Sequence, residues 1–433
     1  MNKKFQNSIF ISIASYRDTE LIPSILDCVN KADKKKRLFF GICLQDTKEK
    51  LYTLKHIKKQ YNLNMKIIFV DWKDSQGACW GRYLIQKKLY NNQTYYLQLD
   101  SHHRFLEQWD DVLIHLLNKK KSQGFHKPII GGYCPGYHAY SNKCDEGGIQ
   151  ISSFDTFTHD GDLIFRPQVL PPSTSKITDV PARFLSGHFI FTDGLFCEEC
   201  LYDPNLYFRG EEITLSARAY TQGYDLFHPT FPIIWHYYLR PTEQKHWDNH
   251  QNGKGFIINT NVRDAKAKER VRKLLGIEKN NINFGRYGLG KHRNLHQYEL
   301  YAGLDFANKK IHKNCYDARN IGSFAFIMSE QEWSNKMLLK KLLAIKLPEE
   351  VNKHIDTNLE SLIMCVENKN NLLLHRVDLK PEELKHLNNN NMEWKKEVGI
   401  EDIPSHVIII PFYKNHTFGP RIKTTEVLYY DIE

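Results

Sequence analysis

The chain has 433 residues, of which 41% are hydrophobic and 25% are charged, and its formal net charge is +10 at pH 7. This composition excludes a largely disordered chain, and the length exceeds that of one ordinary core, so roughly two to three domains are expected. The nine cysteines show no framework spacing, which argues against a disulfide-stabilised scaffold. Cys197 and Cys200 form an isolated pair, so ordinary thiols are expected there rather than a zinc site.

The positive charge is partly concentrated in lysine-rich runs such as Lys34–Arg37 and Lys119–Lys121. Such runs suit acidic or phosphate-rich partners, or solvated helix faces. Aromatic residues are not interleaved with them, so no nucleic acid partner is expected. The chain has neither a signal-peptide pattern nor an apolar run of about 18 residues, so we expect no transmembrane segment and a cytoplasmic location. Signal-less delivery into a host cell is the alternative, and no pattern indicates an oligomeric state.

The N-terminal part of the chain alternates short apolar runs with helix-like segments. The predicted strands span residues 8–14, 38–44, 66–70 and 95–99, and the predicted helices span residues 21–29, 48–60 and 77–89. This alternation predicts an α/β fold with a mainly parallel sheet and helices on both faces. Right-handed crossovers leave the loops on one sheet edge, so Asp18, Asp71, Gly77 and Asp100 are expected near that edge.

Beyond Asp110 the alternation is less regular. The Gly/Pro-rich stretch 128–148 and the turn at Pro171–Pro172 are expected to be loops that face a substrate or an insertion on the acceptor side. More sheet is expected at residues 189–191 and 233–235, with a helix over residues 211–222.

The composition changes again beyond about Phe326. Leu/Lys-rich helices are expected there, followed by an Asn-rich turn at Asn388–Asn391 and a strand at Val407–Ile410. We therefore predict a domain over residues 1–325 and a smaller C-terminal α+β region over residues 326–433, whose role no motif indicates.

Asp100 and His102 follow the predicted strand 95–99 two residues apart. In extended backbone, side chains at that spacing point to the same side and can bind one cation, whereas His103 faces the other side. A carboxylate with an imidazole suits Mn²⁺ or a similar ion better than Ca²⁺. Open α/β sheets bind nucleotides beyond the carboxyl ends of their strands. The spacing therefore predicts metal-assisted nucleotide chemistry, although a chance pair of polar loop residues would look the same.

Five sequence blocks together resemble a known family. They are Ile11–Asp18, Gly77–Arg82, Leu97–His102, Phe208–Glu212 and His236–Arg240. In this order they resemble the polypeptide N-acetylglucosaminyltransferases that modify hydroxyproline in cytoplasmic proteins. More distantly, they are similar to the polypeptide N-acetylgalactosaminyltransferases, which share an Asp-x-His metal motif. The resemblance covers roughly residues 8–325 and implies a GT-A nucleotide-sugar fold, Rossmann-like, with retaining transfer from a UDP-sugar.

The resemblance also implies site roles. His236 would complete the metal site with Asp100 and His102, and a surrounding set would bind the donor. The expected donor-binding residues are Ala14, Ser15, Tyr16, Arg17, Gly77, Arg82, Asp100, Ser101, Ser186 and Gly187. Physical reasons support several of them: the helix that opens at Gly77 favours an anion, and Arg82 can add a charge-assisted bond to a diphosphate. A plain helix start and a core-packed wall are the alternatives.

Glu211 and Glu212 open a predicted helix and are the expected catalytic pair. One of them can simply complement the helix dipole, and the other would bind sugar hydroxyls or orient the acceptor if the resemblance holds. Retaining transfer can proceed by front-face attack in which the leaving phosphate takes the acceptor proton, so we name no protein nucleophile. The Gly288–Arg293 segment lacks the phosphate-loop pattern, and structural roles are expected for Arg293, Tyr298 and Asp305.

The leading hypothesis is a metal-dependent retaining glycosyltransferase. It would use Mn²⁺ or another divalent cation and move N-acetylglucosamine from UDP-GlcNAc to a protein hydroxyl, either hydroxyproline or Ser/Thr. The alternatives are a non-catalytic nucleotide-sugar-binding module, a transferase with a glycan acceptor, and a metal-dependent hydrolase. No motif encodes the acceptor, which is assigned only through the resemblance.

Overall fold

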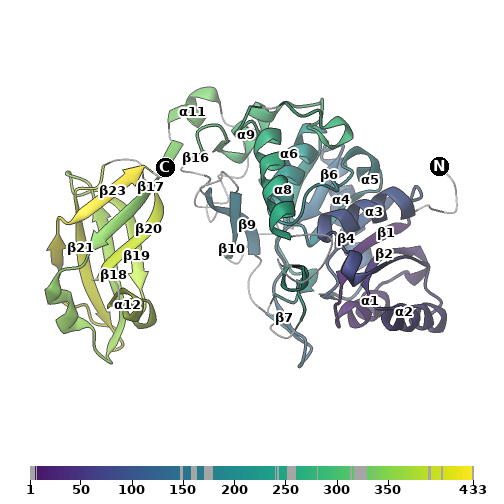
Figure 1. The fold of residues 1–433 in the computed structure, drawn as a ribbon, viewed down its shortest axis with the longest axis horizontal. Coiled ribbons are helices and arrows are strands. Elements are labelled where there is room, and N and C mark those ends of the chain that lie inside the picture. The colour runs from purple at the N-terminus through teal and green to yellow at the C-terminus, as the bar shows by residue number, and fades with distance from the viewer. Residues whose placement is uncertain are drawn as a thin grey trace. The chain divides into compact units, whose positions relative to one another are not determined.

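The chain divides into two compact units in the computed structural model, Met1–Ala307 with Asn314–Met328 and Asn308–Lys313 with Ser329–Glu433 (Figure 1). The structure describes residues 5, 7–146, 150–157, 163–169, 179–238, 240, 243–250, 260–279, 281–312, 315, 329–335, 337–388, 392–400 and 403–431. The predicted boundary at residues 325 and 326, the Pro171–Pro172 turn and most of the Asn388–Asn391 turn lie outside the described residues.

The first unit is built on an eight-stranded sheet with the order β11-β13-β6-β12-β4-β1-β2-β3. Its strands are β1 (Ile9–Tyr16), β2 (Leu38–Asp46), β3 (Met65–Asp71), β4 (Tyr95–Leu99), β6 (Pro128–Gly131), β11 (Asp179–Pro181), β12 (Phe189–Asp193) and β13 (Asp225–Pro229). Strands β1 to β4 pair in parallel, β12 runs antiparallel to both β4 and β6, and β13 is parallel to β6. The predicted α/β class with a mainly parallel sheet is confirmed.

Helices cover both faces of this sheet. The helices of the unit are α1 (Leu21–Asn30), α2 (Lys48–Gln60), α3 (Ala78–Leu89), α4 (Trp109–Ser122), α5 (Phe196–Glu199), α6 (Glu211–Thr221), α7 (His246–Asn249), α8 (Thr260–Leu274) and α9 (Leu295–Ala302). Short 3₁₀ turns lie at η2 (Lys35–Arg37), η3 (Trp72–Asp74) and η4 (Gly285–Tyr287). Among the described residues, no helix combines the length and apolar character needed to span a bilayer.

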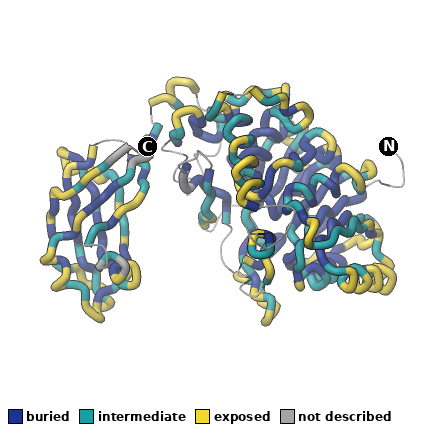
Figure 2. Tube along the Cα trace, in the orientation of Figure 1, coloured by how far each residue is buried: buried dark blue, intermediate teal, exposed yellow. Residues whose placement is uncertain are grey.

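The alternation of side chains along β1 explains the layers. Ile9, Ile11 and Ile13 belong to the core that includes residues of α1, α2 and α4. Phe10 and Ala14 point to the opposite face, towards α3. A strand that is apolar on both faces is typical of the centre of a parallel sheet, and Figure 2 shows the resulting buried interior.

Small strand pairs frame the carboxyl edge of the sheet. The antiparallel pair β5 (His103–Phe105) and β14 (Ile234–His236) matches His236 with His103. The other short strands are β7 (Tyr137–His138), β8 (Lys143–Cys144), β9 (Gln150–Phe157), β10 (Leu163–Val169) and β15 (Leu304–Asp305). The prediction that residues 128–148 are loops is therefore wrong in part, because β6, β7 and β8 lie within that stretch. Backbone pairing there overrides the Gly/Pro content.

The second unit contains two antiparallel sheets. One contains β16 (Lys310–His312), β17 (Met337–Lys346), β20 (Glu393–Ile400) and β23 (Val427–Asp431), and the other contains β18 (Leu359–Glu367), β19 (Leu373–Leu379), β21 (His406–Tyr413) and β22 (Ile422–Thr424). Short helical segments are η6 (Glu349–His354), α11 (Glu330–Asn335) and α12 (Pro381–Asn388). Both sheets contribute to one apolar core, for example through Leu343 of β17 and Leu362 of β18.

The predicted Leu/Lys-rich helices of this unit are mostly wrong. The segment Met337–Lys346 is strand β17, which pairs with β20 on one side and β23 on the other. Leu343 and Ile345 are buried at a spacing of two, so the apolar pattern has the period of a strand where it meets the core. Pairing on both edges outweighs the helix propensity of Leu and Lys.

Gly81 lets helix α3 approach the carboxyl edge of the sheet closely. A Cβ atom at this position would lie 3.2 Å from both the Ala14 Cβ and the Gln45 Nε2, so neither β1 nor β2 leaves room for a larger side chain. This contact sets the height of α3 above the sheet, and Arg82, which follows Gly81, takes its position from it.

We expect Gly81→Leu to lower the free energy of unfolding by about 1–3 kcal/mol, because overpacking forces α3 away from β1 and β2. Chemical denaturation measures this loss. Lys87→Leu is the matched control, since Lys87 is exposed on the same helix and should change stability by less than about 0.5 kcal/mol. Equal stability of the two variants would show that α3 does not depend on this contact.

Candidate active site

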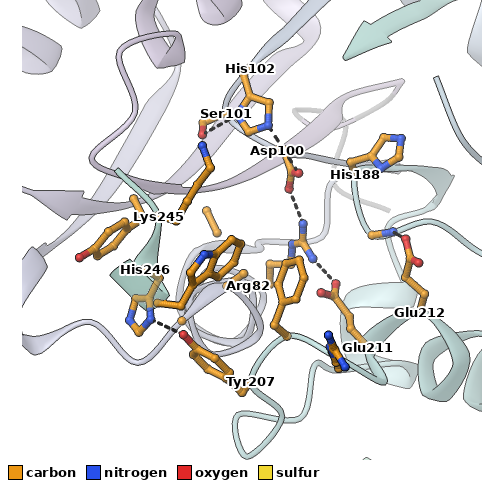
Figure 3. Close-up of a pocket in the computed structure, with 18 of the residues that line it drawn as sticks. Arg82, Asp100, Ser101, His102, His188, Tyr207, Glu211, Glu212, Lys245 and His246 are labelled. Atoms are coloured by element: carbon orange, nitrogen blue, oxygen red, sulfur yellow. Dashed lines mark hydrogen bonds and ion pairs between the residues drawn. The ribbon is translucent and has the colours of Figure 1, made fainter. Parts of the chain in front are cut away.

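A cleft of about 520 Å³ is lined by residues that follow β1 and β4 and by the first turns of α3 and α6 (Figure 3). It brings together most of the predicted site residues. Those that line it are Ala14, Tyr16, Gly77, Arg82, Asp100, Ser101, His102, Gly187, Glu211, Glu212 and His236. Asp18 lines it too, whereas Asp71, the fourth residue expected at this edge, accepts a hydrogen bond from Lys73 N at 3.0 Å and caps η3.

Three predicted donor residues do not line the cleft. Ser15 is fully buried in β1, where strand alternation turns it away from the side that Ala14 and Tyr16 share. Ser186 is also buried and its hydroxyl lies 2.7 Å from His188 Nδ1. The guanidinium of Arg17 lies 4.5 Å from the centre of the Trp72 ring.

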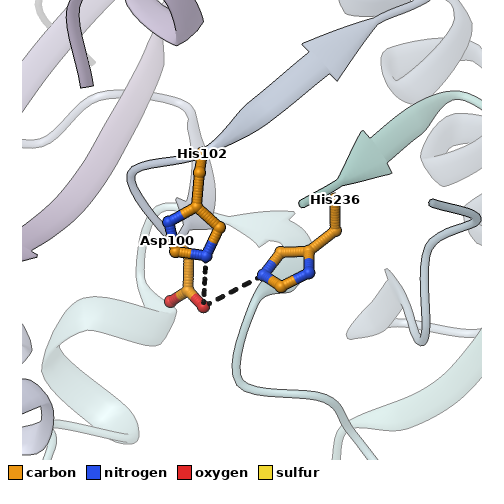
Figure 4. A group of neighbouring side chains, drawn as sticks. All are labelled: Asp100, His102 and His236. Carbon is orange, nitrogen blue, oxygen red and sulfur yellow. Dashed lines mark hydrogen bonds and ion pairs between the residues drawn. The ribbon is translucent and has the colours of Figure 1, made fainter. Parts of the chain in front are cut away.

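Asp100, His102 and His236 converge at one point of the cleft (Figure 4). One potential ligand atom from each lies within 4.8 Å of the others. Asp100 Oδ2 is 3.4 Å from His236 Nε2 and 3.8 Å from His102 Nε2. Asp100 and His102 come from the loop between β4 and β5, and His236 ends β14, so the β5–β14 pairing closes the group.

Asp18 fixes the ring of His102. Its Oδ2 lies 2.7 Å from His102 Nδ1 and accepts a hydrogen bond of 2.6 Å from the Ser101 hydroxyl. Burial opposes ionisation of Asp18, but the His102 ring and these hydrogen bonds outweigh it and hold the pKa of Asp18 well below its ordinary value. An ionised carboxylate only accepts, so Nδ1 donates in this contact, and Nε2 is the ring nitrogen that faces Asp100.

The protonation states of His236 and Asp100 also suit metal binding. Burial lowers the pKa of His236 to about 4, so its imidazole is neutral at pH 7. Burial opposes the charge of Asp100, yet the adjacent Arg82 guanidinium keeps the pKa of this carboxyl well below its usual range. His102 Nε2 is buried and has no hydrogen-bond partner within the described part of the chain. One carboxylate and two imidazoles, of which His102 has the unpaired nitrogen, fit a divalent cation.

His103 does not belong to this group. Its Nδ1 lies 3.0 Å from the Trp235 carbonyl, to which it donates, and its Nε2 accepts from the Asp100 backbone N–H at 3.3 Å. Both ring nitrogens are therefore used to hold the loop that carries Asp100. The ring lies beside His236, with centroids 5.0 Å apart.

Arg82 lines the cleft and lies between two carboxylates. Its NH2 group donates to Asp100 Oδ1 at 2.5 Å, and its NH1 group donates to Glu211 Oε1. Glu211 also accepts a hydrogen bond of 2.7 Å from the Tyr202 hydroxyl. Both carboxylates thus engage the cation that was expected to bind a diphosphate.

Glu212 is the less constrained member of the expected catalytic pair. Its Oε1 accepts a hydrogen bond of 2.9 Å from Gly187 N, and the side chain lines the cleft (Figure 3). Burial raises the pKa of Glu212 to about 7, with a further contribution from the Glu211 charge. This carboxyl can therefore donate or accept a hydrogen bond near neutral pH.

A second group of side chains lines the cleft near Tyr16. The His246 ring meets Tyr16 edge-on with centroids 4.9 Å apart, and His246 Nδ1 lies 2.7 Å from the Tyr207 hydroxyl. Lys245 and Trp247 flank His246 in the lining. Sequence reasoning did not single out Tyr133, His188, Tyr207, Lys245, His246 or Trp247. For Lys245, His246 and Trp247 the one available signal was the density of Lys, His and Trp in their polar segment, since no periodicity marks that segment.

The other motifs do not contribute to the cleft. Cys197 and Cys200 are buried free thiols. Arg293 donates to the carbonyl of Tyr224 at 2.9 Å and to Asp225 Oδ1 at 2.8 Å, so it ties the segment after Gly288 to the end of α6 and the start of β13.

The model of the family described as "Glycosyltransferase (GlcNAc)" matches residues 8–58 and 50–308, which contain the whole cleft. The chain belongs to this glycosyltransferase family. A search of curated proteins found no match. The family match assigns glycosyl transfer to the chain. The hydroxyproline acceptor is a finer assignment that only the sequence blocks imply.

Several solved structures are similar to this glycosyltransferase at low sequence identity. The crystal structure of GalNAc-T7 with UDP, GalNAc and Mn²⁺ is 14% identical with a TM-score of 0.48, and the match covers 62% of this chain and 48% of that chain. S. aureus TarS 1–349 with UDP-GlcNAc is 12% identical with a TM-score of 0.41 and coverages of 64% and 68%. A mannosyltransferase from Pyrobaculum calidifontis with GDP-Man and Mn²⁺ is 8% identical with a TM-score of 0.33, over 54% and 58% of the two chains. The chain thus spans about half the length of GalNAc-T7.

We expect Glu212→Gln to flatten the pH dependence of stability. The pKa of Glu212 is about 7 in the folded chain against an ordinary value of 4.5, so its neutral form is favoured by folding. Its contribution is therefore complete below pH 4.5 and is lost as the pH rises through 7, by roughly 1–3 kcal/mol. Chemical denaturation of both proteins from pH 4.5 to 8 measures the difference. A constant difference across this range would contradict the prediction.

Proposed function

We propose that this chain is a metal-dependent retaining glycosyltransferase that moves N-acetylglucosamine from UDP-GlcNAc to a protein hydroxyl, either hydroxyproline or Ser/Thr. The observation that carries the proposal is the convergence of Asp100, His102 and His236 in the cleft of a chain from the GlcNAc glycosyltransferase family. A non-catalytic sugar-binding module has less need of such a group.

The chemistry of the triad supports a borderline divalent ion such as Mn²⁺. One carboxylate oxygen and two imidazole nitrogens would hold it, with Asp18 orienting His102 from behind. A bound cation of this kind neutralises charge that develops on the phosphate oxygens of a leaving nucleotide.

Two further cations of the chain suit the diphosphate. Arg240 and Lys245 both line the cleft, and Arg240 NH1 lies 3.2 Å from Asp18 Oδ2. The Lys245 ammonium donates to the Arg240 carbonyl at 2.6 Å, so the two side chains are held on the same segment. We assign them to the phosphates in place of Arg82, whose guanidinium already spans two carboxylates.

The nucleoside would lie against the aromatic end of the cleft. Gly77 opens α3 with a φ of 101°, and a Cβ there would lie 3.0 Å from the Tyr207 ring. The missing side chain at Gly77 thus lets the Tyr207 ring pack against the backbone at this end of the cleft, where the Tyr16 and His246 rings supply flat surface for a ribose or base. The N–H groups at the start of α3 favour the adjacent anion.

The proposed transfer needs no protein nucleophile. The acceptor hydroxyl would attack the anomeric carbon of the sugar from the side on which the bond to the diphosphate breaks. An oxygen of the leaving diphosphate would take the hydroxyl proton. Glu212 would hydrogen-bond a sugar hydroxyl, since its carboxyl faces the cleft and its second oxygen is not used by Gly187. Phe208 and Trp247 pack edge-on with centroids 5.2 Å apart, and both are exposed, which suits a peptide acceptor.

The central test measures UDP release from UDP-GlcNAc with Mn²⁺ and a panel of peptides that contain hydroxyproline, Ser or Thr. We expect His102→Ala to lower the rate by at least roughly 10- to 100-fold, because a lost ligand costs no less than a lost supporting contact. His115→Ala is the matched control, since His115 is exposed on α4 and does not line the cleft.

The results separate the alternatives. Equal turnover by His102→Ala and the intact chain would remove the metal argument. Binding of the donor with no turnover on any acceptor would favour a sugar-binding module, and equal sugar release with and without acceptor would favour a hydrolase. Transfer to glycans but not to peptides would replace the proposed acceptor class.

We expect Asp18→Asn to weaken Mn²⁺ binding by roughly 10- to 100-fold, because the amide no longer fixes the Nδ1 proton of His102. Titration calorimetry with Mn²⁺ measures this. Asp193→Asn serves as control, since Asp193 pairs with Lys121 at 2.6 Å and does not line the cleft. Unchanged affinity in Asp18→Asn would show that the ring of His102 needs no carboxylate support.

A further inference from the structure

Arg82 is a buried cation whose two terminal nitrogens are each engaged by a carboxylate. Its side chain is 4% exposed, its NH1 and NH2 groups engage Glu211 and Asp100, and its Nε is buried and makes no hydrogen bond within the described residues. A diphosphate could take the place of either carboxylate only by breaking a buried ion pair. Losing one partner of a buried pair is strongly unfavourable.

We propose that Arg82 and Glu211 are positioning residues that orient and charge-balance the metal ligand Asp100. This inference rests on the metal site of the proposed function. It gives Arg82 and Glu211 roles other than the donor binding and catalysis expected from sequence, because a residue that acts through Asp100 need not contact substrate.

The two oxygens of Asp100 have different tasks in this arrangement. Oδ1 lies 2.5 Å from Arg82 NH2, whereas Oδ2 faces His236 Nε2 at 3.4 Å and His102 Nε2 at 3.8 Å. A carboxylate that turned both oxygens towards a cation would have to give up Arg82. The ion pair therefore presents one oxygen, at a fixed angle, to the space between the imidazoles.

Glu211 keeps Asp100 effective as an anion. Arg82 alone would offset the charge of Asp100 and leave a pair with no net charge at the site. With Glu211 as a second carboxylate, the group of Asp100, Arg82 and Glu211 carries one net negative charge. A cation is then attracted to a site that still contains a guanidinium.

Tyr202 and Gln98 anchor the far end of this chain of contacts. The Tyr202 hydroxyl donates to Glu211 Oε1 at 2.7 Å, and Gln98 Nε2 donates to the Tyr202 oxygen at 2.6 Å. Gln98 lies in β4, and Asp100 directly follows this strand. The contacts through Arg82, Glu211 and Tyr202 therefore begin and end at the same strand end. Tyr202 is buried and does not line the cleft, so it can affect the cation only through its contacts with Glu211 and with Arg82, whose guanidinium lies 5.6 Å from the centre of the Tyr202 ring.

The test is Mn²⁺ binding by titration calorimetry without donor, with Glu211→Gln and Tyr202→Phe. We expect Glu211→Gln to weaken binding by roughly 10- to 100-fold and Tyr202→Phe by roughly 2- to 10-fold, since the latter removes one hydrogen bond. At saturating Mn²⁺ the kcat of both variants should return to near that of the intact chain. A positioning role predicts this recovery, whereas a residue that takes part in the reaction would leave kcat low.

A second carboxylate of the chain provides matched controls. Glu199 accepts from Lys127 Nζ at 2.8 Å and from the Tyr224 hydroxyl at 2.7 Å. Like Glu211, it thus pairs with one basic side chain and one tyrosine, but it does not line the cleft. Glu199→Gln and Tyr224→Phe should therefore change Mn²⁺ affinity by less than about twofold. Thermal unfolding in EDTA checks that each variant is folded, and Tyr202→Phe decides the matter if Glu211→Gln is not.

The outcomes are distinct. Mn²⁺ affinity in Tyr202→Phe and Glu211→Gln equal to that of the intact chain would overturn the positioning role while leaving the proposed function in place. A low kcat in Glu211→Gln at saturating Mn²⁺ would overturn it in favour of direct catalysis. An intact chain that binds no Mn²⁺ would overturn the metal site itself, and this inference with it.

Discussion

Three carboxylates that line the cleft, those of Asp18, Asp100 and Glu211, lie beside an apolar sheet, and each has a partner from another part of the chain. Removing a carboxylate from water costs several kcal/mol unless a cation or hydrogen-bond donors replace the solvent. Asp18 is satisfied by His102 and Ser101, and Arg82 joins Asp100 to Glu211. These contacts connect the loops after β1 and β4 to the start of α6, so the site and the packing around it depend on the same ion pairs.

The same contacts decide what the cleft can do. Asp18 engages His102 Nδ1, and His102 Nε2 is buried without a hydrogen-bond partner among the described residues. Burial keeps His236 neutral, so two imidazoles face one carboxylate oxygen. One carboxylate oxygen with two imidazole nitrogens is a ligand set that suits a divalent cation. Membership of the GlcNAc glycosyltransferase family gives the group a use, and the ion pairs behind Asp100 explain how one oxygen is held in place.

Local pattern was a reliable guide wherever apolar period and element length agreed. The strands and helices of the first hundred or so residues follow the alternation of continuous apolar runs with amphipathic segments, and helix Lys48–Gln60 has the predicted bounds. Pattern failed at Met337–Lys346, where Leu and Lys favour a helix but two neighbouring strands pair with the backbone. It also failed for His246 and Tyr207, which lie in segments without periodicity.

The sequence alone determined the mainly parallel sheet, the strand end that carries Asp100 and His102, and the family resemblance, because these depend on residues close together in the chain. Only the tertiary structure decided that Arg82 and Glu211 face each other and Asp100, that Ser15 and Ser186 turn away from the cleft, and that His246 lines it. Those outcomes depend on which side chains meet across elements far apart in sequence. Such meetings are governed by the desolvation of charges and by packing of the whole sheet, and no local pattern records them.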